Sequence, residues 1–425
     1  MHKAKSILMV VENLSVPSDP RVWREAQTLR QLGFRVCIIS PKGETRDKDT
    51  YNCIDGIHIY RYHLPPAKNT TFGYMKEYLF ALLKTFGLSL NIWYRHGFSV
   101  IHAANPPDIF FVLGLFYRFF GKAYVFDQHD LAPEMFRVKF QGRMALCHRL
   151  LRLCEYYSYR TADIVITTNA SQRKLAIKRG RCHAEKIFVV RNGPDIARYV
   201  PVAAEPSLKQ GKRFLLVYIG IMGAQDGVEY ALYALQKLVY QRGRQDVSLT
   251  LMGDGDQLPA LKALTHQLRL DSYVHFTGWV QRHDLLRYLT MADIGLSPDP
   301  SNELNDRSTM LKTMEYMAMG KPVVAFDLPE TRYSAQEAAL YATANSVEDF
   351  ADKIEMLLDD AELRQQMGAY GRKRIAEELC WERTKVQLWR AYETLFATTG
   401  TIEIETASLS AKGKEDLLLA TIGGE

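Results

Sequence analysis

The chain alternates short apolar or β-branched runs with helical stretches, and this alternation constrains its fold more than any other sequence feature. The first series contains the expected strands Ser6–Val11, Arg35–Ser40, Val100–Ala103, Tyr124–Gln128, Ile164–Thr168 and Ile187–Arg191. After an aperiodic stretch, a second series contains Phe214–Ile219, Val247–Met252, Val274–Phe276, Ile294–Leu296 and Val323–Phe326. Such alternation is typical of parallel sheets with crossover helices.

The sequence therefore predicts an α/β protein with two Rossmann-like doubly wound domains that face each other across a cleft. Sheets of this kind bind ligands outside the carboxyl ends of their strands. The expected divisions are a first domain at 1–200, a linker at 201–212, a second domain at 213–380, a C-terminal helix at 381–398 that can pack back on the first domain, and a mobile tail at 399–425.

Length and composition agree with two domains. At 425 residues and 47% hydrophobic content, the chain is too long for one core and apolar enough for two. Its six cysteines show no metal-ligand spacing, so we expect reduced core residues and no metal. The N-terminus lacks a small-residue cleavage site, which favours a cytoplasmic protein. Charges interrupt the apolar stretch Phe72–Tyr94, so no transmembrane span is expected.

The two halves of the chain carry opposite charge. Residues 1–200 hold 30 Lys and Arg against 16 Asp and Glu, a net charge of +14, whereas residues 201–425 hold 24 against 32, a net charge of −8. A basic domain suggests an anionic partner such as nucleic acid, anionic lipid or a phosphorylated acceptor. A solvated basic face without a partner explains the same asymmetry.

The strongest local signal is the segment Ser308–Val324, STMLKTMEYMAMGKPVV. Ser308 is placed to cap a helix. The amides of the first turn, those of Thr309, Met310 and Leu311, then point outward and could hold a phosphate.

Lys312 and Glu315 follow in the same segment, three residues apart, and so share a helical face. A cation for a diphosphate and a carboxylate for ribose hydroxyls would together suit a nucleotide sugar. An ordinary surface ion pair, worth about 0.2–0.5 kcal/mol, explains the spacing without any function.

Nine short elements stand along the chain in a fixed order. They are DPRVWREAQTLRQLGFRV (Asp19–Val36), NPPD (Asn105–Asp108), FDQHDLAPE (Phe126–Glu134), ADIVITTN (Ala162–Asn169), VVRNGPD (Val189–Asp195), YIGIMGAQDGVEYAL (Tyr218–Leu232), LMGDGDQ (Leu251–Gln257), FTGWV (Phe276–Val280) and KTMEYMAMGKPVV (Lys312–Val324). In order and spacing they resemble the retaining glycosyltransferases of the GT-B architecture, the large family that includes sucrose synthase and many bacterial cell-envelope enzymes. The resemblance covers nearly the whole chain.

Carried over residue by residue, the resemblance implies that Glu315 binds the nucleotide ribose. The family's first glutamate, expected eight positions earlier, is replaced here by Arg307. In the loop that begins at Gly220, the family often carries an Arg and a Lys where this chain has Ile221 and Asp226.

The diphosphate is therefore expected to meet Arg307, Lys312 and the backbone of Gly223. Gly220 and Gly253 are expected to line the donor pocket. A subgroup that makes bacterial surface polysaccharides is similar in its GxMGxQDGV and EYMAxGKP stretches.

His129 follows an expected strand and, by the resemblance, approaches the donor phosphates and the transferred sugar. Asp130 and Glu134 could orient His129 or receive an acceptor hydroxyl. A structural histidine is the alternative. The resemblance places the loop with Asp19 and Arg21 beside the acceptor, although an ordinary Arg21–Glu25 ion pair at a helix start needs no function.

The resemblance implies a retaining transfer of a sugar from a nucleotide-diphosphate sugar, UDP by family frequency, to an acceptor saccharide. A helix N-terminus with Lys312 and Arg307 would stabilise the departing diphosphate electrostatically, so no metal and no cofactor beyond the co-substrate are expected. We interpret DGD at 254–256 as a strand-end turn and not as a metal-binding D-x-D element. Two alternatives remain: a sugar-nucleotide epimerase of the same fold, and a non-catalytic sugar-nucleotide-binding assembly subunit.

Three stretches of the basic half, residues 72–94, 109–120 and 136–160, mix aromatic residues with Lys and Arg, as helices at a bilayer interface do. Each Lys or Arg near an anionic surface contributes about 1 kcal/mol. We therefore expect peripheral attachment to the inner face of a membrane and a lipid-linked acceptor in surface polysaccharide biosynthesis. The alternative is that the aromatics pack the core and the arginines are solvated. Nucleic acid is not expected, because no binding motif accompanies the charge.

Overall fold

The computed structural model describes residues 5–43, 46–65, 71–140, 142 and 144–398, and it divides into two compact units. The first unit combines the chain up to Val190 with the residues from Lys385 onward, and the second holds Arg191–Thr384. The expected boundary at 200 and linker at 201–212 therefore fall within the second unit. The expected tail at 399–425 lies outside the described residues.

The first unit is built on an eight-stranded sheet with the order β3-β4-β2-β1-β5-β6-β7-β8. All neighbours are parallel except the β3–β4 hairpin. The strands are β1 (Ser6–Val10), β2 (Arg35–Pro41), β3 (Tyr51–Ile54), β4 (Ile57–Tyr62), β5 (Val100–Ala104), β6 (Ala123–Gln128), β7 (Ile164–Thr167) and β8 (Ile187–Val189).

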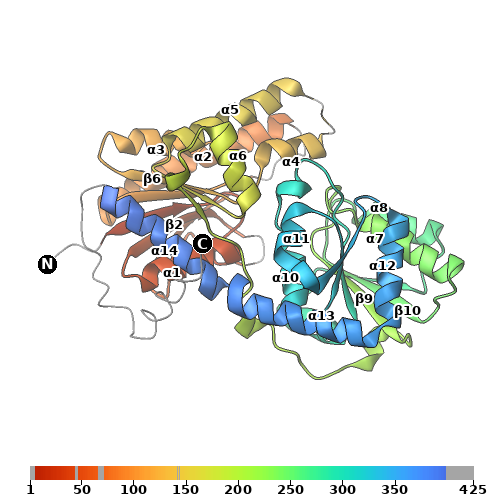
Figure 1. The fold of residues 1–425 in the computed structure, drawn as a ribbon. Helices are drawn as coiled ribbons and strands as arrows, with labels where there is room; N and C mark the ends of the chain where they lie inside the picture. The colour runs from red at the N-terminus through yellow and green to blue at the C-terminus, as the bar shows by residue number, and fades with distance from the viewer. Residues whose placement is uncertain (1–4, 44–45, 66–70, 141, 143, 399–425) are drawn as a thin grey trace. The chain divides into compact units, whose positions relative to one another are not determined.

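Helices cover both faces of this sheet, with α2, α3, α5 and α6 on one side and α1 and α14 on the other (Figure 1). The apolar side chains of alternate strand residues pack against the first group, and the residues between them face the second. The helices are α1 (Pro20–Gln31), α2 (Thr71–Arg95), α3 (Phe111–Arg118), α4 (Ala132–Lys139), α5 (Ala145–Thr161), α6 (Ala170–Gly180) and α14 (Trp381–Thr398), with a short helix η1 (Ala184–Lys186).

The hairpin β3–β4 was not expected from the sequence. Its two-residue turn is Asp55–Gly56, and both residues have positive φ, 52° and 76°. An Asp-Gly pair between two short apolar runs is a strong hairpin signal. The sequence therefore carries a signal for this hairpin, although its strands belong to neither series of expected parallel strands.

The second unit contains a six-stranded sheet with the order β11-β10-β9-β12-β13-β14, in which every neighbouring pair is parallel. In chain order this is third, second, first, fourth, fifth, sixth, the arrangement of doubly wound nucleotide-binding folds. The strands are β9 (Phe214–Ile219), β10 (Val247–Met252), β11 (Val274–Gly278), β12 (Ile294–Ser297), β13 (Val323–Phe326) and β14 (Ala339–Ala342).

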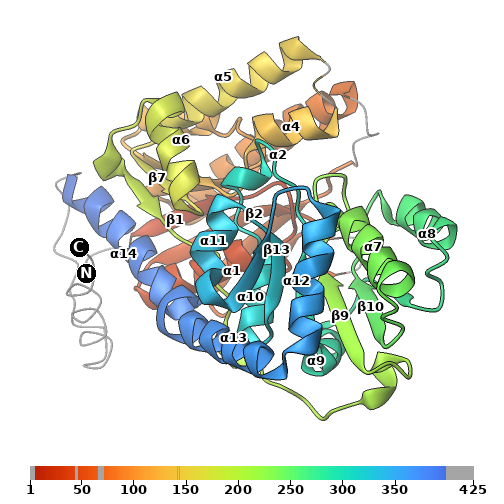
Figure 2. The ribbon, with the colours of Figure 1, turned by 45° about the vertical axis from the view of Figure 1, so that its right-hand side comes forward.

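Two helical layers enclose this sheet (Figure 2). The helices α7, α8 and α12 pack on one face, and α9, α10 and α11 pack on the other. The helices are α7 (Val228–Gln236), α8 (Leu258–Gln267), α9 (Arg282–Met291), α10 (Leu311–Ala318), α11 (Pro329–Ala335), α12 (Val347–Asp359) and α13 (Ala361–Arg374), with short helices η2 (Ile196–Arg198), η3 (Pro206–Lys209), η4 (Lys237–Gln241), η5 (Asn305–Arg307), η6 (Gln336–Ala338) and η7 (Ile375–Leu379).

The predicted fold class, two doubly wound α/β domains, is confirmed. Among the described residues, no helix has both the length and the hydropathy that a membrane crossing needs.

Candidate functional site

In the second unit, two glycine loops meet at the carboxyl ends of β9 and β10. Gly220 follows β9 and Gly253 follows β10, with φ of 143° and 138°. A Cβ at Gly253 would collide with the carbonyl oxygen of Gly220. The two loops therefore pack backbone on backbone beside the point where the strand order reverses, between β9 and β12, where open α/β sheets bind ligands.

A side chain at Gly220 would also crowd its neighbours. A Cβ there would lie 3.3 Å from the Tyr218 hydroxyl oxygen and 3.4 Å from Cε of Lys312. The absence of a side chain therefore keeps the end of Lys312 close to the loop backbone.

Lys312 is buried at the start of α10. Its Nζ lies 2.6 Å from Asp299 Oδ1 and 3.6 Å from Asp226 Oδ1, and 4.9 Å from the Tyr218 ring centroid. Burial opposes the charge, but Asp299, Tyr218 and Asp226 outweigh it and hold the pKa of Lys312 well above its usual value. The ammonium group is therefore permanently charged.

Asp226 occupies the loop position where a cation was expected by resemblance. Its Oδ2 accepts hydrogen bonds from the backbone N of Gly223 at 3.0 Å and from Gln225 Nε2 at 2.9 Å. Burial raises the pKa of Asp226 to about 6, although Lys312 opposes the shift. The carboxyl group thus titrates close to neutral pH in the folded protein.

The start of α10 differs from the expectation. The helix begins at Leu311 with Met310 as its N-cap, and Ser308 does not cap it. Ser308 Oγ instead donates to Leu304 O at 2.8 Å, because Ser308 ends the short helix η5. The amides of the first turn therefore start at Leu311, and Thr309 lies before the helix.

Glu315 and Lys312 do share α10, as their spacing predicted, but their partners differ. The Tyr199 hydroxyl donates to Glu315 Oε1, whereas Lys312 faces Asp299 and Asp226. Arg307 lies half-buried in η5, and its Nη1 donates to Glu303 O at 2.5 Å. The second unit thus places Gly220, Gly223 and Lys312 together, with Glu315 one helical turn further on.

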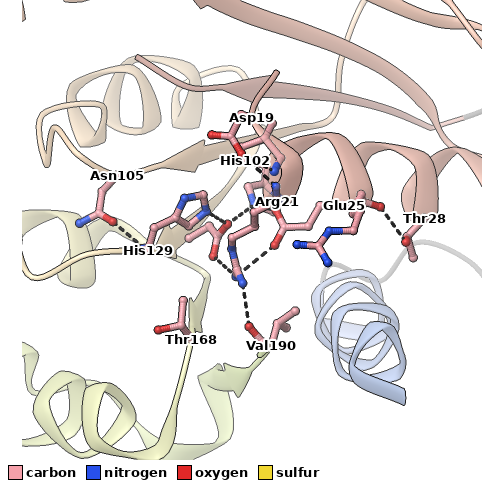
Figure 3. Close-up of polar contacts among 12 residues, drawn as sticks. Asp19, Arg21, Glu25, Thr28, His102, Asn105, His129, Thr168 and Val190 are labelled. Atoms are coloured by element: carbon pink, nitrogen blue, oxygen red, sulfur yellow. Dashed lines mark hydrogen bonds and ion pairs between the residues drawn. The ribbon is translucent and has the colours of Figure 1, made fainter. Parts of the chain in front are cut away.

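In the first unit, His129 follows β6 and is placed by Asn105 of the Asn-Pro-Pro-Asp motif (Figure 3). Asn105 Oδ1 accepts the backbone N–H of His129 at 2.6 Å and of Asp130 at 3.1 Å, and its Nδ2 donates to Asp130 O at 2.9 Å. One amide therefore fixes the backbone of the His-Asp turn. The sequence indicated the motif only by resemblance and gave no role to Asn105.

The imidazole of His129 points back toward the sheet, where its Nε2 lies 2.5 Å from Asp127 Oδ2. Burial alone would raise the pKa of Asp127, but Arg21 and His129 beside it hold that pKa well below its usual value. Asp127 was not singled out in the sequence. Its position two residues before His129, at the end of a strand, was the available signal.

The three residues expected on the acceptor side are all buried within the first unit. Asp19 caps α1 by accepting from the backbone N of Arg21 and of Val22, each at 3.0 Å. Glu134 binds Arg179 through two hydrogen bonds. Each has partners inside its own unit, and their acceptor role stays a prediction.

Arg21 contacts Asp127 at 2.9 Å and Glu25 at 3.0 Å, and its Nη1 donates to Val190 O. The Arg21–Glu25 pair at the start of α1 is therefore buried and is joined to a third charged group, Asp127. Ligand atoms of Glu25, His102 and Asp127 lie within 4.8 Å of one another, a set that could hold a metal ion.

Comparison with known proteins agrees with this architecture. The family described as "Glycosyl transferase 4-like domain" matches residues 18–193, and "Glycosyl transferases group 1" matches residues 213–360. The chain belongs to the GT-B glycosyltransferases.

The names of the curated relatives indicate varied substrates. An alpha-D-kanosaminyltransferase of Streptomyces kanamyceticus is 29% identical over 36% of this chain and 39% of its own length, and a glycogen synthase of Mycobacterium tuberculosis is 26% identical over 55% of each. A chitobiosyldiphosphodolichol beta-mannosyltransferase of Candida albicans is 21% identical over 81% of this chain and 79% of its own. The chain thus spans about half the length of the first two.

Solved GT-B structures share the fold along nearly the whole chain. Sucrose-phosphate synthase from Thermosynechococcus elongatus matches with a TM-score of 0.75 at 18% identity. The match covers 93% of this chain and 100% of the synthase chain. Anabaena HepE, solved with UDP and glucose, matches with a TM-score of 0.67 at 15% identity. The match covers 92% of this chain and 100% of the HepE chain. These likenesses concern the fold.

Proposed function

We propose that this GT-B glycosyltransferase moves a sugar from a nucleotide-diphosphate sugar, a UDP-sugar, to a lipid-linked saccharide acceptor. The observation that carries the donor half is the set of Gly220, Gly223 and Lys312 at the strand-order reversal of the second unit. A glycine backbone without side chains, next to a buried and permanently charged ammonium group, is a suitable site for a diphosphate. The HepE structure, solved with UDP, supports the choice of nucleotide.

Glu315 is the proposed ribose ligand. It is half-buried on α10 and already accepts one hydrogen bond, from Tyr199. A carboxylate has two oxygens with about four lone pairs, so it can accept further hydroxyl donors. Vicinal ribose hydroxyls are such donors, and their bonds to a carboxylate are charge-assisted.

The proposed reaction retains the anomeric configuration, as the family resemblance implies, and uses neither a metal nor a further cofactor. Negative charge develops on the departing diphosphate, and Lys312 is the cation placed to stabilise it. His129 is proposed to contact the transferred sugar or its phosphates.

The acceptor half of the proposal rests on the outer surface of the first unit. Leu146, Leu150, Leu153 and Tyr157 are 72%, 49%, 48% and 45% exposed along one face of α5. Their spacing of four, three and four residues makes a continuous apolar stripe. The exposed residues Arg149 and Arg152 stand among them.

The neighbouring helices extend this surface. Helix α2 exposes Met75, Leu79 and Leu83 on one face, and the turn after α3 exposes Phe119 at 90% and Phe120 at 48%. Aromatic contacts hold the three helices side by side, with Phe86 of α2 on Phe116 of α3 and Phe111 of α3 on Tyr157 of α5. Apolar stripes flanked by arginine fit an anionic membrane surface.

The donor half is tested by thermal unfolding of the full chain with UDP-, GDP- and ADP-sugars. A ligand that binds only the folded state at 100 times its Kd stabilises by about 2.7 kcal/mol. We expect UDP-sugars to raise Tm most. Donor-only incubation then separates the alternatives, since an epimerised nucleotide indicates an epimerase. Binding with no turnover by any acceptor or by water indicates an assembly subunit.

The membrane half is tested by co-sedimentation with phosphatidylcholine vesicles, with and without phosphatidylglycerol, at low and high salt. We expect salt-sensitive binding to the anionic vesicles, weakened by Arg149→Gln with Arg152→Gln and abolished by Leu150→Glu. Matched controls at exposed positions of the second unit are Arg269→Gln with Arg383→Gln, for the arginine pair, and Met356→Glu, which likewise places a carboxylate at an exposed apolar position. Negligible binding of the unaltered protein to every vesicle would refute this part.

A further inference from the structure

A buried polar cluster lies beneath His129, and the proposed donor chemistry does not use it (Figure 3). Each of its residues is at most 3% exposed. They come from separate elements: Arg21 and Glu25 from α1, His102 from β5, Asp127 from β6 and Tyr392 from α14.

Strand register explains why these groups meet. Ala103 pairs with Phe126, and Ala104 pairs with Asp127, between β5 and β6. Ala103 and Phe126 belong to the apolar core on the α3 side. Because side chains alternate along a strand, His102 and Asp127 project to the opposite face, where α1 and α14 pack.

The charge state of the cluster decides which nitrogen of His129 holds a proton. Arg21 Nη2 lies 2.9 Å from Asp127 Oδ1, and the low pKa of Asp127 keeps that carboxylate ionised. An ionised carboxylate only accepts hydrogen bonds. The 2.5 Å contact between its Oδ2 and His129 Nε2 therefore requires a proton on Nε2.

We propose that Asp127 is a positioning residue for His129: its carboxylate, held by Arg21, keeps the proton of the neutral imidazole on Nε2 and leaves Nδ1 as the hydrogen-bond acceptor. The acceptor nitrogen is then fixed in place before any substrate arrives. The identity of the group that donates a hydrogen bond to Nδ1 rests on the proposed function. The assignment of the tautomer does not depend on it.

His102, Tyr392 and Glu25 complete the cluster around Asp127. His102 Nδ1 contacts the Tyr392 hydroxyl at 2.8 Å, and its Nε2 lies 3.5 Å from Asp127 Oδ2 and 3.6 Å from Glu25 Oε2. Burial raises the pKa of Glu25 well above its usual value, although Arg21 opposes the shift.

Other charged groups around His129 do not replace this contact. Asp19 accepts from the first amides of α1, and burial raises the pKa of the Asp130 carboxyl although His129 opposes the shift. A metal ion held by Glu25, His102 and Asp127 is the competing arrangement. The guanidinium of Arg21, 2.9–3.0 Å from both carboxylates, would repel it.

The test is ¹⁵N NMR of the full chain with labelled histidine at pH 9, with the His129 signals assigned by their loss in His129→Gln. We expect a protonated-type shift for Nε2 and an unprotonated-type shift for Nδ1. In Asp127→Asn, we expect His129 to exchange between tautomers or to reverse them. Tyr392→Phe disturbs the same cluster without touching His129 and should leave its tautomer unchanged.

A proton on Nδ1 in the unaltered protein would overturn the proposal, and this measurement needs no variant to fold. An unchanged tautomer in folded Asp127→Asn would also overturn the proposal. A stoichiometric metal found in the purified protein by elemental analysis would do the same. For transfer, Asp127→Asn should lower kcat about 100-fold at unchanged KM, the size of effect expected from a misplaced group. A correct tautomer without any transferase activity would leave this inference standing and refute the proposed function.

Discussion

Replacement of Asp226 by Asn tests the charge balance around Lys312. Burial raises the pKa of Asp226 from 3.8 to about 6 in the folded protein. A shift of about 2 pH units corresponds to about 3 kcal/mol. The side chain is only 16% exposed, so solvent screening removes little of this.

The sign follows from the direction of the shift. Because the folded pKa lies above the unfolded one, the contribution of Asp226 to stability is fully present below pH 3.8 and is lost as pH rises through about 6. The unaltered protein should therefore lose up to about 3 kcal/mol from this residue between pH 4 and pH 8. Asp226→Asn should not, because its amide carries no charge at either pH.

The assay is thermal unfolding of the full chain at pH 4, pH 5 and pH 8. A change of 1 kcal/mol moves Tm by about 2–4 °C for a unit of this size, so the variant should melt roughly 6–12 °C higher than the unaltered protein at pH 8. At pH 5, which lies between the two pKa values, about half of this difference should already be present, and at pH 4 the two proteins should differ little. Asp256→Asn, the same change at an exposed position of the same unit, is the control.

Nucleotide affinity gives a second readout of the same substitution. An ionised Asp226 partly neutralises Lys312 and repels a diphosphate bound there. Asp226→Asn should therefore bind UDP about tenfold more tightly at pH 8, or about 1.4 kcal/mol. Equal melting of variant and parent at pH 8 would refute the argument about burial. A raised Tm with unchanged UDP affinity would refute only the placement of the diphosphate at Lys312.

Three further substitutions probe the site. Glu315→Gln should weaken donor binding by about 1.5–3 kcal/mol in isothermal titration, because an amide accepts ribose hydroxyls more weakly than a carboxylate, and an unchanged Kd would remove Glu315 from the site. His129→Ala should lower kcat by at least about 100-fold with the circular dichroism spectrum intact, whereas early melting at full activity per folded molecule would make His129 structural. Gly253→Ala should destabilise the second unit by about 1–3 kcal/mol in urea, because its φ of 138° disfavours a side chain and a Cβ meets the Gly220 carbonyl, and unchanged stability would contradict the close packing of the loops.

The strands of both sheets were largely predictable, because buried parallel strands are short apolar runs. Phe214–Ile219, Val247–Met252 and Val323–Phe326 form β9, β10 and β13 with the expected bounds. Strand β14 was missed, since its sequence Ala-Leu-Tyr-Ala has no β-branched residue to mark it. The cap on α10 was also wrong, because Ser308 had a competing carbonyl acceptor four residues earlier, at Leu304.

Charged contacts within the units were the least predictable part. Arg21 and Glu25 are one helical turn apart, which suggests an ordinary ion pair at a helix start, yet both are buried. The partner that Arg21 finds in the interior is Asp127, which lies more than a hundred positions later in the chain. Lys312 likewise faces Asp299 and Asp226, which local spacing does not connect to it. Helical periodicity shows which residues share a face, but not what that face meets.

The end of the chain gives the clearest case of such a distant contact. Tyr392 of α14 is buried against Phe34 and Phe396, and its hydroxyl meets His102, 290 positions earlier in the chain. Residues 385–398 therefore complete the core of the first unit, to which the sequence assigned residues 1–200 together with a helix at 381–398 that can pack back on it. A fragment ending at 200 would expose Phe34 and leave a buried His102 without its hydroxyl partner, which costs about 1–3 kcal/mol for the polar group alone. The positioning of Asp127 and His129 must accordingly be measured on the full chain.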